Sequence, residues 1–457
     1  MKTSTSLPRF IQVSLLLLVF LSPILVFTES TASEAPQNVA QIAADESLSI
    51  ILMIGDGMGY DHVELARLVE VGEFGSLNMQ DSDWNTSVLT HSADAVVTDS
   101  AAAGTAISTG NKTDNGKVGV DPSNIPLETI LEIAQTLNKS TGVVSKCRIV
   151  DATPASFMTH TGSRYNFDEI ARQIVEEADV DVLLGGGSDY FSSSQISTMI
   201  TNGYSMVYNR TELASITSGR VFGLFNGYHM DFEYDRDYSL QPSIAEMTNK
   251  SIELLSQDTD GFFLMVEAGR IDLAAHDDDQ VRTALETIEF DKAIDIAMDY
   301  VSDHNNTILI VTTDHETEGL VVMSHNLNSE LPADLVSETD KRALRAERAN
   351  NVTVDWTASY HTNSPVPFFG YGSVFSELPE NIAIDNTNVF RIMKDFYDGV
   401  PLSVDEVEPP TTTTTTSTIT TTTTTTDIAP VDPVVATVAF AVTSVGVIAI
   451  FIVARKQ

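Results

Sequence analysis

The sequence has little cysteine and few basic residues. Its one cysteine, Cys147, excludes an internal disulfide and a cluster of thiolate metal ligands. Cys147 lies in the largely apolar segment 143–150, which favours a small buried side chain over a nucleophile. Lys and Arg number 25 against 64 Asp and Glu, giving a formal net charge of −39. Such a charge repels nucleic acid and anionic lipid, which argues against either as a bound partner.

The N-terminal end carries a segment that we expect to lie outside the folded body. An apolar stretch over residues 10–27 follows Lys2 and Arg9, and small residues come after it. This pattern is typical of a secretory signal peptide over residues 1–32. Because the apolar stretch is long, an uncleaved anchor is the alternative interpretation.

The C-terminal end has the pattern of a membrane anchor. Residues 434–454 are 21 uncharged residues, and Arg455 and Lys456 follow them. A helix of this length spans about 30 Å, which matches one hydrocarbon core. We therefore predict a transmembrane helix over 433–454 and a short basic cytoplasmic tail over 455–457, with the catalytic domain outside, at the cell surface. A lipid-anchor signal removed during maturation is the alternative.

Between the body and this segment lies a stretch of low complexity. Thr fills fourteen of the sixteen positions from 411 to 426. A segment so rich in Thr has no apolar periodicity and cannot bury a core. We predict that residues 401–432 form a stalk, with its Thr side chains as candidates for O-glycosylation.

The remaining residues, 48–400, alternate apolar runs with helical patterns. Two segments, 126–137 and 281–301, carry apolar residues at helical spacing. Other runs are continuous and apolar or β-branched, as in strands buried on both faces of a parallel sheet: 49–54, 142–145, 180–184, 262–266 and 307–312. This alternation predicts a layered α/β domain.

Acidic and imidazole side chains follow three of these predicted strands. Asp56 comes directly after the first strand, and the run Asp314-His315 follows the last. Residues 262–266 lead into Glu267, with Asp272 and His276 close behind. Ligands of open α/β sheets bind at the carboxyl ends of strands, so these side chains can converge there. Carboxylates and imidazoles suit zinc and magnesium. Each residue alone could be a turn former or a helix cap, but three such clusters together favour a metal site.

A further segment, 97–106, has capping residues followed by small ones. Thr98 and Asp99 favour a helix start, which places Ser100 near a helix N-terminus. Backbone amides and the helix dipole there favour an alkoxide or a phosphate. This segment alone leaves open an ordinary Ala-rich helix in which Ser100 is only a cap.

Together these motifs resemble those of the alkaline phosphatase family. The matching segments run in order through about residues 48–400: 54–59, 98–105, 151–155 with Arg164, 263–272 with His276, 313–315 and 361–362. The spacings from Asp151 to Arg164 and from Glu267 through Asp272 to His276 agree with the family. The resemblance implies a three-layer α/β sandwich in which helices flank a central, mostly parallel sheet.

The resemblance also implies an activity and a set of site residues. The activity is hydrolysis of small phosphate monoesters. The enzyme would hold two zinc ions and one magnesium ion, and it would be a homodimer. Ser100 would accept the phosphate, and Arg164 would clamp it. One zinc would be held by Asp272, His276 and His361. The second zinc would be held by Asp56, Asp314 and His315, with Ser100 as a further ligand. Magnesium would be held by Thr153, Glu267 and the bridging Asp56, with Asp151 orienting its waters.

Two positions depart from the family pattern. Leu273 follows Asp272 where relatives usually place Lys, His or an aromatic residue, so turnover, pH optimum and magnesium affinity are left open, but the reaction is not. Glu318 occupies a position where Gly is commoner.

Three other functions fit parts of the same pattern. A sulfatase would need a modifiable Cys or Ser in a Cys-x-Pro-x-Arg-like motif, and residues 147–149 do not form one. A phosphodiesterase generally lacks the third-metal residues and the clamping arginine, whereas Thr153, Glu267 and Arg164 are all in this chain. A non-catalytic surface protein would have lost the nucleophile or a ligand, and neither is lost.

Overall fold

The computed structural model describes residues 47–332, 337–407, 440–443 and 446–449. The predicted signal peptide, residues 1–32, and the predicted tail, residues 455–457, lie outside the described residues. So does most of the predicted stalk.

The centre of the body is a mixed but mostly parallel sheet. Strand β13 is antiparallel to both neighbours, β8 and β2, and every other neighbouring pair is parallel. Within the described residues this sheet has ten strands, in the order β14 (Ala383–Asp385), β2 (Trp84–Leu89), β13 (Val366–Tyr371), β8 (Thr307–Thr312), β1 (Ser49–Ile54), β7 (Phe262–Glu267), β3 (Ser140–Arg148), β4 (Val182–Gly186), β6 (Val221–Leu224) and β5 (Ser205–Val207).

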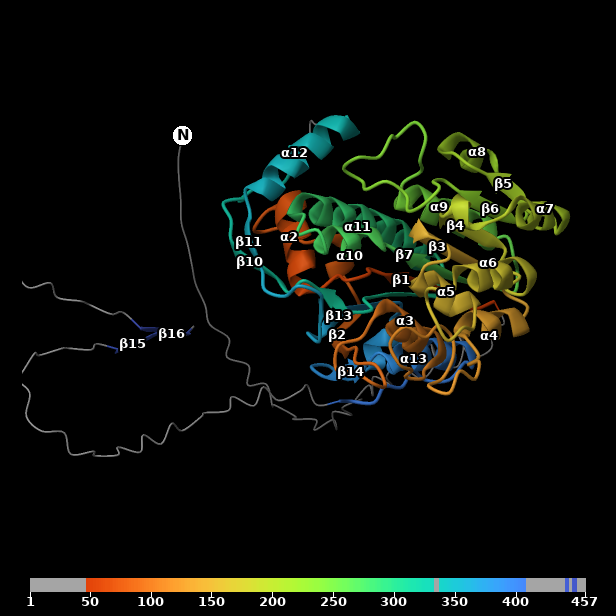
Figure 1. Ribbon diagram of the computed structural model, residues 1–457, viewed down its shortest axis with the longest axis horizontal. Coiled ribbons are helices and arrows are strands. Elements are labelled where there is room, and N and C mark those ends of the chain that lie inside the picture. The colour runs from red at the N-terminus through yellow and green to blue at the C-terminus, as the bar shows by residue number, and fades with distance from the viewer. Residues whose placement is uncertain (1–46, 333–336, 408–439, 444–445, 450–457) are drawn as a thin grey trace, which may run out of the picture. The chain divides into compact units, whose positions relative to one another are not determined.

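Helices cover both faces of this sheet, as Figure 1 shows. On β1, residues 50, 52 and 54 belong to one hydrophobic core and residues 51 and 53 to the other, because successive strand side chains point to opposite faces. The first core includes residues of α3 (Ser100–Thr109), α4 (Ile130–Thr136), α5 (Ala152–Met158), α6 (Phe167–Glu176), α7 (Ser193–Thr201) and α13 (Thr387–Tyr397). The second includes residues of α2 (Tyr60–Val71), α8 (Arg210–Ser215), α9 (Ile244–Leu255), α10 (Arg270–Ala275), α11 (Gln280–Asp303) and α12 (Glu338–Asn350). The predicted layered α/β fold with a mostly parallel sheet is therefore confirmed.

Within the described part of residues 47–407, two small antiparallel pairs lie outside the main sheet. Strand β9 (Glu316–Thr317) pairs with β12 (His361–Thr362), and β10 (Leu320–Ser324) pairs with β11 (Thr353–Trp356). The first pair sets His361 opposite Thr317. It thereby brings a histidine from late in the chain to the carboxyl end of β8.

The described start of the predicted stalk lies against the body. Leu402 and Val404 pack on the first hydrophobic core, and Glu406 forms a β-bridge with Ile384 of β14. The folded body thus continues past residue 400 to residue 407.

Where residues 433–454 are described, they do not form the predicted helix. Residues 440–443 and 446–449 form two short antiparallel strands, β15 (Phe440–Thr443) and β16 (Gly446–Ala449), and the rest of that segment is outside the described residues. The segment is rich in β-branched Val, Ile and Thr, which favour extended backbone over helix. Among the residues described, no helix combines the length and the apolar character needed to cross a bilayer.

Candidate active site

Three adjacent strands deliver the predicted ligands to one edge of the sheet. Strand β1 pairs with β8 on one side and β7 on the other, and Ile54 is level with both Glu267 and Thr312. Asp56 lies just beyond the end of β1, Glu267 is the last residue of β7, and Asp314 follows β8. The continuous apolar runs that bury these strands therefore also align the polar residues that follow them.

A first group of ligand atoms comes from α10 and β12. The Nε2 atom of His276 is 3.2 Å from Nε2 of His361 and 3.4 Å from Oδ1 of Asp272. The Nε2 atom of His361 is 3.6 Å from the same Asp272 oxygen. Asp272 and His276 are one helical turn apart and so project from the same face. Two imidazole nitrogens and a carboxylate oxygen in this arrangement can hold one cation.

Hydrogen bonds on the outer side of each imidazole fix which nitrogen faces this group. His361 Nδ1 is 3.0 Å from the carbonyl oxygen of Thr98, and His276 Nδ1 is 2.9 Å from Oε1 of Glu318. Both partners are acceptors, so each Nδ1 carries the hydrogen and each Nε2 presents a lone pair. Two lone pairs 3.2 Å apart repel one another unless a cation lies between them.

A second group surrounds the fully buried His315. Its Nε2 lies 3.2 Å from Oδ2 of Asp314, 3.6 Å from Oδ1 of Asp56 and 3.2 Å from Oγ of Ser100. Its Nδ1 contacts the Thr317 hydroxyl at 3.2 Å, and that hydroxyl donates to Asp272 Oδ1 at 2.6 Å. Thr317 therefore joins the two groups.

Several oxygens of the predicted ligands are buried and have no hydrogen-bond partner within the described residues. They are Oδ1 of Asp56, Oδ2 of Asp314 and Oγ1 of Thr153. Burial, together with the nearby Asp314 and Asp272 carboxylates, raises the pKa of Asp56 well above its ordinary value. Burial likewise raises the pKa of Glu267 to about 8. Buried oxygens without donors are costly in a protein interior, and bound cations satisfy them. The donor set therefore fits zinc and magnesium. We call these residues the ligand cluster: Asp56, Thr153, Glu267, Asp272, His276, Asp314, His315 and His361.

Ser100 is the first residue of α3, and the cap of that helix is its neighbour. Asp99 accepts a hydrogen bond from the backbone N–H of Ala102 at 3.0 Å, so Ser100 is not the cap. Gly104 allows α3 to approach α5 closely, since a Cβ there would lie 2.5 Å from the Ser156 hydroxyl. This approach sets the Ser100 hydroxyl, in a side chain only 4% exposed, against the ligand cluster.

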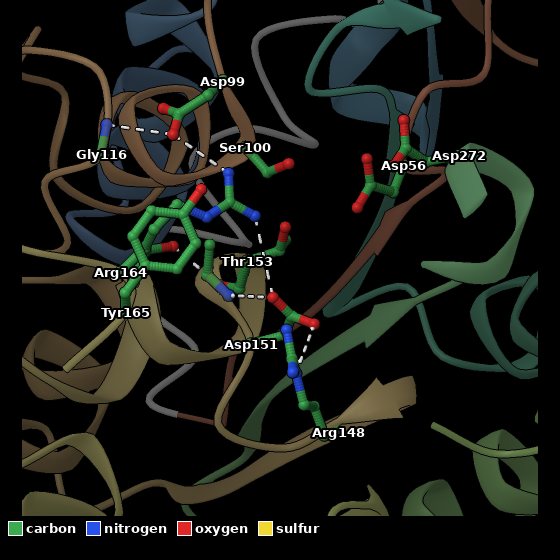
Figure 2. Close-up of polar contacts among 12 residues, drawn as sticks. Asp56, Asp99, Ser100, Gly116, Arg148, Asp151, Thr153, Arg164, Tyr165 and Asp272 are labelled. Atoms are coloured by element: carbon green, nitrogen blue, oxygen red, sulfur yellow. Dashed lines mark hydrogen bonds and ion pairs between the residues drawn. The ribbon is translucent and has the colours of Figure 1, made fainter. Parts of the chain in front are cut away.

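Arg164 lies beside Ser100 between two carboxylates. Figure 2 shows its guanidinium between Asp99 and Asp151, with Asp56 and Asp272 across the site. One guanidinium nitrogen is 3.0 Å from Oδ2 of Asp99, and the other is 3.7 Å from Oδ1 of Asp151. The same Asp99 oxygen also accepts a hydrogen bond from the backbone N–H of Gly116. The guanidinium is thus fixed before any substrate arrives.

Asp151 is in turn held by Arg148. The Nε atom of Arg148 donates to Asp151 Oδ2 at 3.0 Å, and its Nη1 contacts the hydroxyls of Tyr190 and Tyr228 at 2.8 and 2.9 Å. Burial opposes ionisation of Asp151, but Arg148 and Arg164 outweigh it and lower the pKa of Asp151. We call Asp99, Arg148, Asp151 and Arg164 the arginine cluster. Asp151, which the sequence suggested as an organiser of magnesium waters, lies in this cluster.

A third set of potential ligand atoms, from Cys147, Asp151 and His229, lies nearby. Burial raises the pKa of the Cys147 thiol well above its ordinary value, so it stays protonated. Asp151 already has two arginine partners. This set is therefore poorly suited to a cation.

The structure brings together all the site residues suggested by the sequence and adds several that it did not reveal. Thr317 and Arg148 gave no signal of their own. Asp99 was recognised only as a cap, and Glu318 only as a departure from the family pattern. The contacts of these residues join positions far apart in the chain, such as Glu318 with His276.

Comparisons with known proteins agree with this geometry. A family model described as alkaline phosphatase matches residues 48–343. Alkaline phosphatase 4 of Bacillus subtilis (strain 168) is 31% identical over 79% of this chain and 91% of its own length. The structure of a cold-active alkaline phosphatase from Shewanella sp. is 30% identical, has a TM-score of 0.67, and covers 78% of this chain and 100% of its own. A solved variant of the alkaline phosphatase from the Antarctic bacterium TAB5, with Mg bound in the M3 site, is 27% identical, has a TM-score of 0.64 and covers 76% of this chain and 97% of its own. The chain belongs to the alkaline phosphatase family and is a phosphatase enzyme.

Proposed function

We propose that this chain hydrolyses small phosphate monoesters to an alcohol and inorganic phosphate through a phosphoserine at Ser100. The observation that carries the proposal is the position of the Ser100 hydroxyl. It is 3.2 Å from Nε2 of His315, in the ligand cluster, and the arginine cluster lies on its other side. A nucleophile between a set of cation ligands and a fixed guanidinium is what phosphoryl transfer requires.

The ligand cluster would hold two zinc ions and one magnesium ion. Asp272, His276 and His361 would hold one zinc. The second zinc would lie among Asp56, Asp314 and His315, next to Ser100. Thr153 and Glu267, with Asp56 shared, would hold magnesium. When bound, these ions supply positive charge that stabilises the serine alkoxide, the leaving oxygen and the attacking water.

The residues of the chain position the substrate around Ser100. Arg164 presents its planar fork to two phosphate oxygens, while Asp99 and Asp151 hold the fork in place. The N-terminus of α3 adds a favourable dipole. The Ser100 hydroxyl releases its proton to solvent, and its oxygen bonds to phosphorus as the ester P–O bond breaks. The departing oxygen takes up a proton from solvent and leaves as the alcohol. Water then bonds to phosphorus as the serine P–O bond breaks, which releases phosphate and restores Ser100.

The test measures turnover of p-nitrophenyl phosphate at alkaline pH. We expect EDTA to abolish turnover, and zinc with magnesium to restore it. Ser100→Ala should remove most activity and leave the metal content unchanged. Ser108→Ala is a matched control, because Ser108 is buried in the same helix and donates only to backbone carbonyls. Near-full turnover by Ser100→Ala would exclude the covalent mechanism, and faster cleavage of a diester than of the monoester would exclude the substrate class.

The location and assembly of the protein form a separate part of the proposal. Export of the body to the cell surface rests on residues 1–32, and a homodimer rests on family membership. Protease treatment of intact cells tests the first, because a body inside the cell would be protected. Light scattering of the purified protein tests the second.

A further inference from the structure

Glu318 is a buried carboxylate outside the predicted ligand sets that contacts one of the predicted ligands. It is 5% exposed, and its Oε1 lies 2.9 Å from Nδ1 of His276. The other ring nitrogen of His276 faces Asp272 and His361. Within the described residues His276 is the only ion-pair partner of Glu318. The carboxylate therefore acts on the imidazole from the side opposite the ligand cluster.

The backbone at Glu318 is in a conformation that its side chain does not favour. Its φ is +63°, in the left-handed region. The other non-glycine residues of the described chain with positive φ are all Asn or Asp, whose short polar side chains tolerate this region: Asn124, Asn138, Asp179, Asp278 and Asn381. Glutamate has no such local compensation. A strained residue of this kind persists only where the surrounding structure fixes it, often at functional sites.

Two backbone hydrogen bonds hold Glu318 in this conformation. Its N–H donates to the carbonyl of Tyr360, and its carbonyl accepts from the N–H of Ala358, both at 2.9 Å. The next residue, Gly319, has a φ of +59°, and a Cβ there would lie 2.4 Å from the Thr357 hydroxyl. The turn after β9 is therefore bound to the segment that leads into His361. This arrangement directs the Glu318 side chain at His276.

The three histidines of the ligand cluster differ in their outer partners. His361 contacts the neutral carbonyl of Thr98, and His315 contacts the neutral hydroxyl of Thr317. Of the three, only His276 has a carboxylate as the outer partner of its Nδ1 atom. A carboxylate behind a ligating imidazole fixes its tautomer and raises its basicity toward a metal more than a neutral acceptor does.

We propose that Glu318 is a positioning residue for zinc at Asp272, His276 and His361. This inference rests on the proposed function, which assigns zinc to these three residues. Glu318 accepts the Nδ1 hydrogen of His276, holds Nε2 toward Asp272 and His361, and adds a negative charge behind the ligand. Zinc binds more tightly as a result, and the conformational cost at residue 318 is offset in the zinc-bound protein.

The experiment measures zinc bound per chain, by metal analysis after dialysis against buffers of defined free zinc. It compares the full chain with Glu318→Gly, which relieves the backbone strain and removes the acceptor, and Glu318→Gln, which keeps an acceptor without the charge. We expect half-saturation of one zinc site to need about 10–100 times more free zinc in Glu318→Gly. Glu318→Gln should show a smaller loss of about threefold to tenfold.

Asn138→Gly is the matched control. Asn138 has a φ of +57° and lies between α4 and β3, at the end of the sheet opposite the site. This variant likewise places glycine at a position with positive φ, and its zinc curve should coincide with that of the unmodified chain. The melting temperature of metal-free Glu318→Gly should be no lower than that of the unmodified metal-free chain, because the variant removes strain.

Zinc curves of both Glu318 variants that coincide with the unmodified chain would overturn this inference. If Glu318→Gly does not fold, the zinc curve of Glu318→Gln alone tests the inference. A Glu318→Gln curve that coincides with that of the unmodified chain would then overturn it. Failure of the proposed function is a different result, in which the unmodified chain binds no zinc or does not cleave p-nitrophenyl phosphate.

Discussion

The ligand cluster and the arginine cluster lie on two sides of Ser100 and have opposite electrostatics. In the ligand cluster, burial and neighbouring carboxylates raise the pKa values of Asp56 and Glu267. In the arginine cluster, two guanidinium groups lower the pKa of Asp151 although it is also buried. The ligand cluster leaves buried oxygens without partners, whereas each carboxylate of the arginine cluster has donors from the chain itself.

This difference separates what the chain supplies from what it must bind. The arginine cluster is complete within the polypeptide and is organised in advance for an anion. The ligand cluster needs cations to balance its carboxylates. Under the proposed function, cations in the ligand cluster beside Arg164 would let a protein with a net charge of −39 attract a phosphate ester at this site.

Replacing Asp56 should have the largest effect, because this residue serves two of the proposed metal positions. Its Oδ1 is buried and unpartnered, 3.6 Å from His315 Nε2. We expect Asp56→Ala to bind less zinc and less magnesium and to lose about 10³-fold in kcat/KM, since a metal contributes several kcal/mol to the transition state. Metal analysis and turnover of p-nitrophenyl phosphate check this. Full metal content in the variant would show that metal binding by the ligand cluster does not depend on Asp56.

Replacing Arg164 should disrupt the arginine cluster and leave the ligand cluster intact. We expect Arg164→Ala to lose about 10²-fold in kcat/KM through weaker stabilisation of the phosphoryl group, with unchanged metal content. Inhibition by inorganic phosphate should weaken as well. The kcat/KM of Arg164→Lys should lie between those of Arg164→Ala and the unmodified chain, because an ammonium keeps the charge but not the planar fork. Loss of metal from Arg164→Ala would mean that the two clusters are not independent.

The sequence revealed the central strands more readily than the strands that lie between them and the β14 edge of the sheet. The strands β1, β7 and β8 are continuous apolar runs, and their predicted positions agree with the structure to within a residue. The strands β2 and β13 were missed. Alternate residues of β2 are buried and the rest are partly or fully exposed, and β13 contains Pro367, which is unfavourable in a strand. Such strands are defined by their pairing partners and not by local pattern.

The same limit applies to the site. The predicted ligands follow strand ends or lie in recognisable motifs, so sequence could identify them. Their outer partners depend on contacts made only after folding. The acceptor for His361 is the backbone carbonyl of Thr98, which no side-chain pattern marks. The hydroxyls that contact Arg148 belong to Tyr190 and Tyr228, which lie 42 and 80 residues further along the chain.

Replacing Arg148 should have a smaller effect than replacing Arg164. Arg148 holds Asp151, which in turn faces Arg164. We expect Arg148→Gln to lose about tenfold in kcat/KM, mainly through a higher KM, because the guanidinium of Arg164 is then less well oriented. Arg172→Gln is the control, since Arg172 pairs with three carboxylates on the exposed surface of the body. An equal loss in both variants would indicate a general charge effect.

Asp291 offers the smallest effect and tests whether a raised pKa alone marks a cation ligand. Burial raises its pKa from 3.8 to about 6, yet its oxygens accept the N–H groups of Asn78 and Met79. The folded state therefore keeps this proton to higher pH than the unfolded state. The stabilisation is complete below the ordinary pKa and is lost as the pH rises through about 6.

The free energy of unfolding of the unmodified chain, minus that of Asp291→Asn, should fall by about 1.4 kcal/mol between about pH 5 and pH 8. Terms common to both chains cancel in this difference. Because Asp291 has its donors within the chain, the fall should be the same in EDTA as with zinc and magnesium, and a metal-dependent fall would show that this carboxylate behaves like those of the ligand cluster.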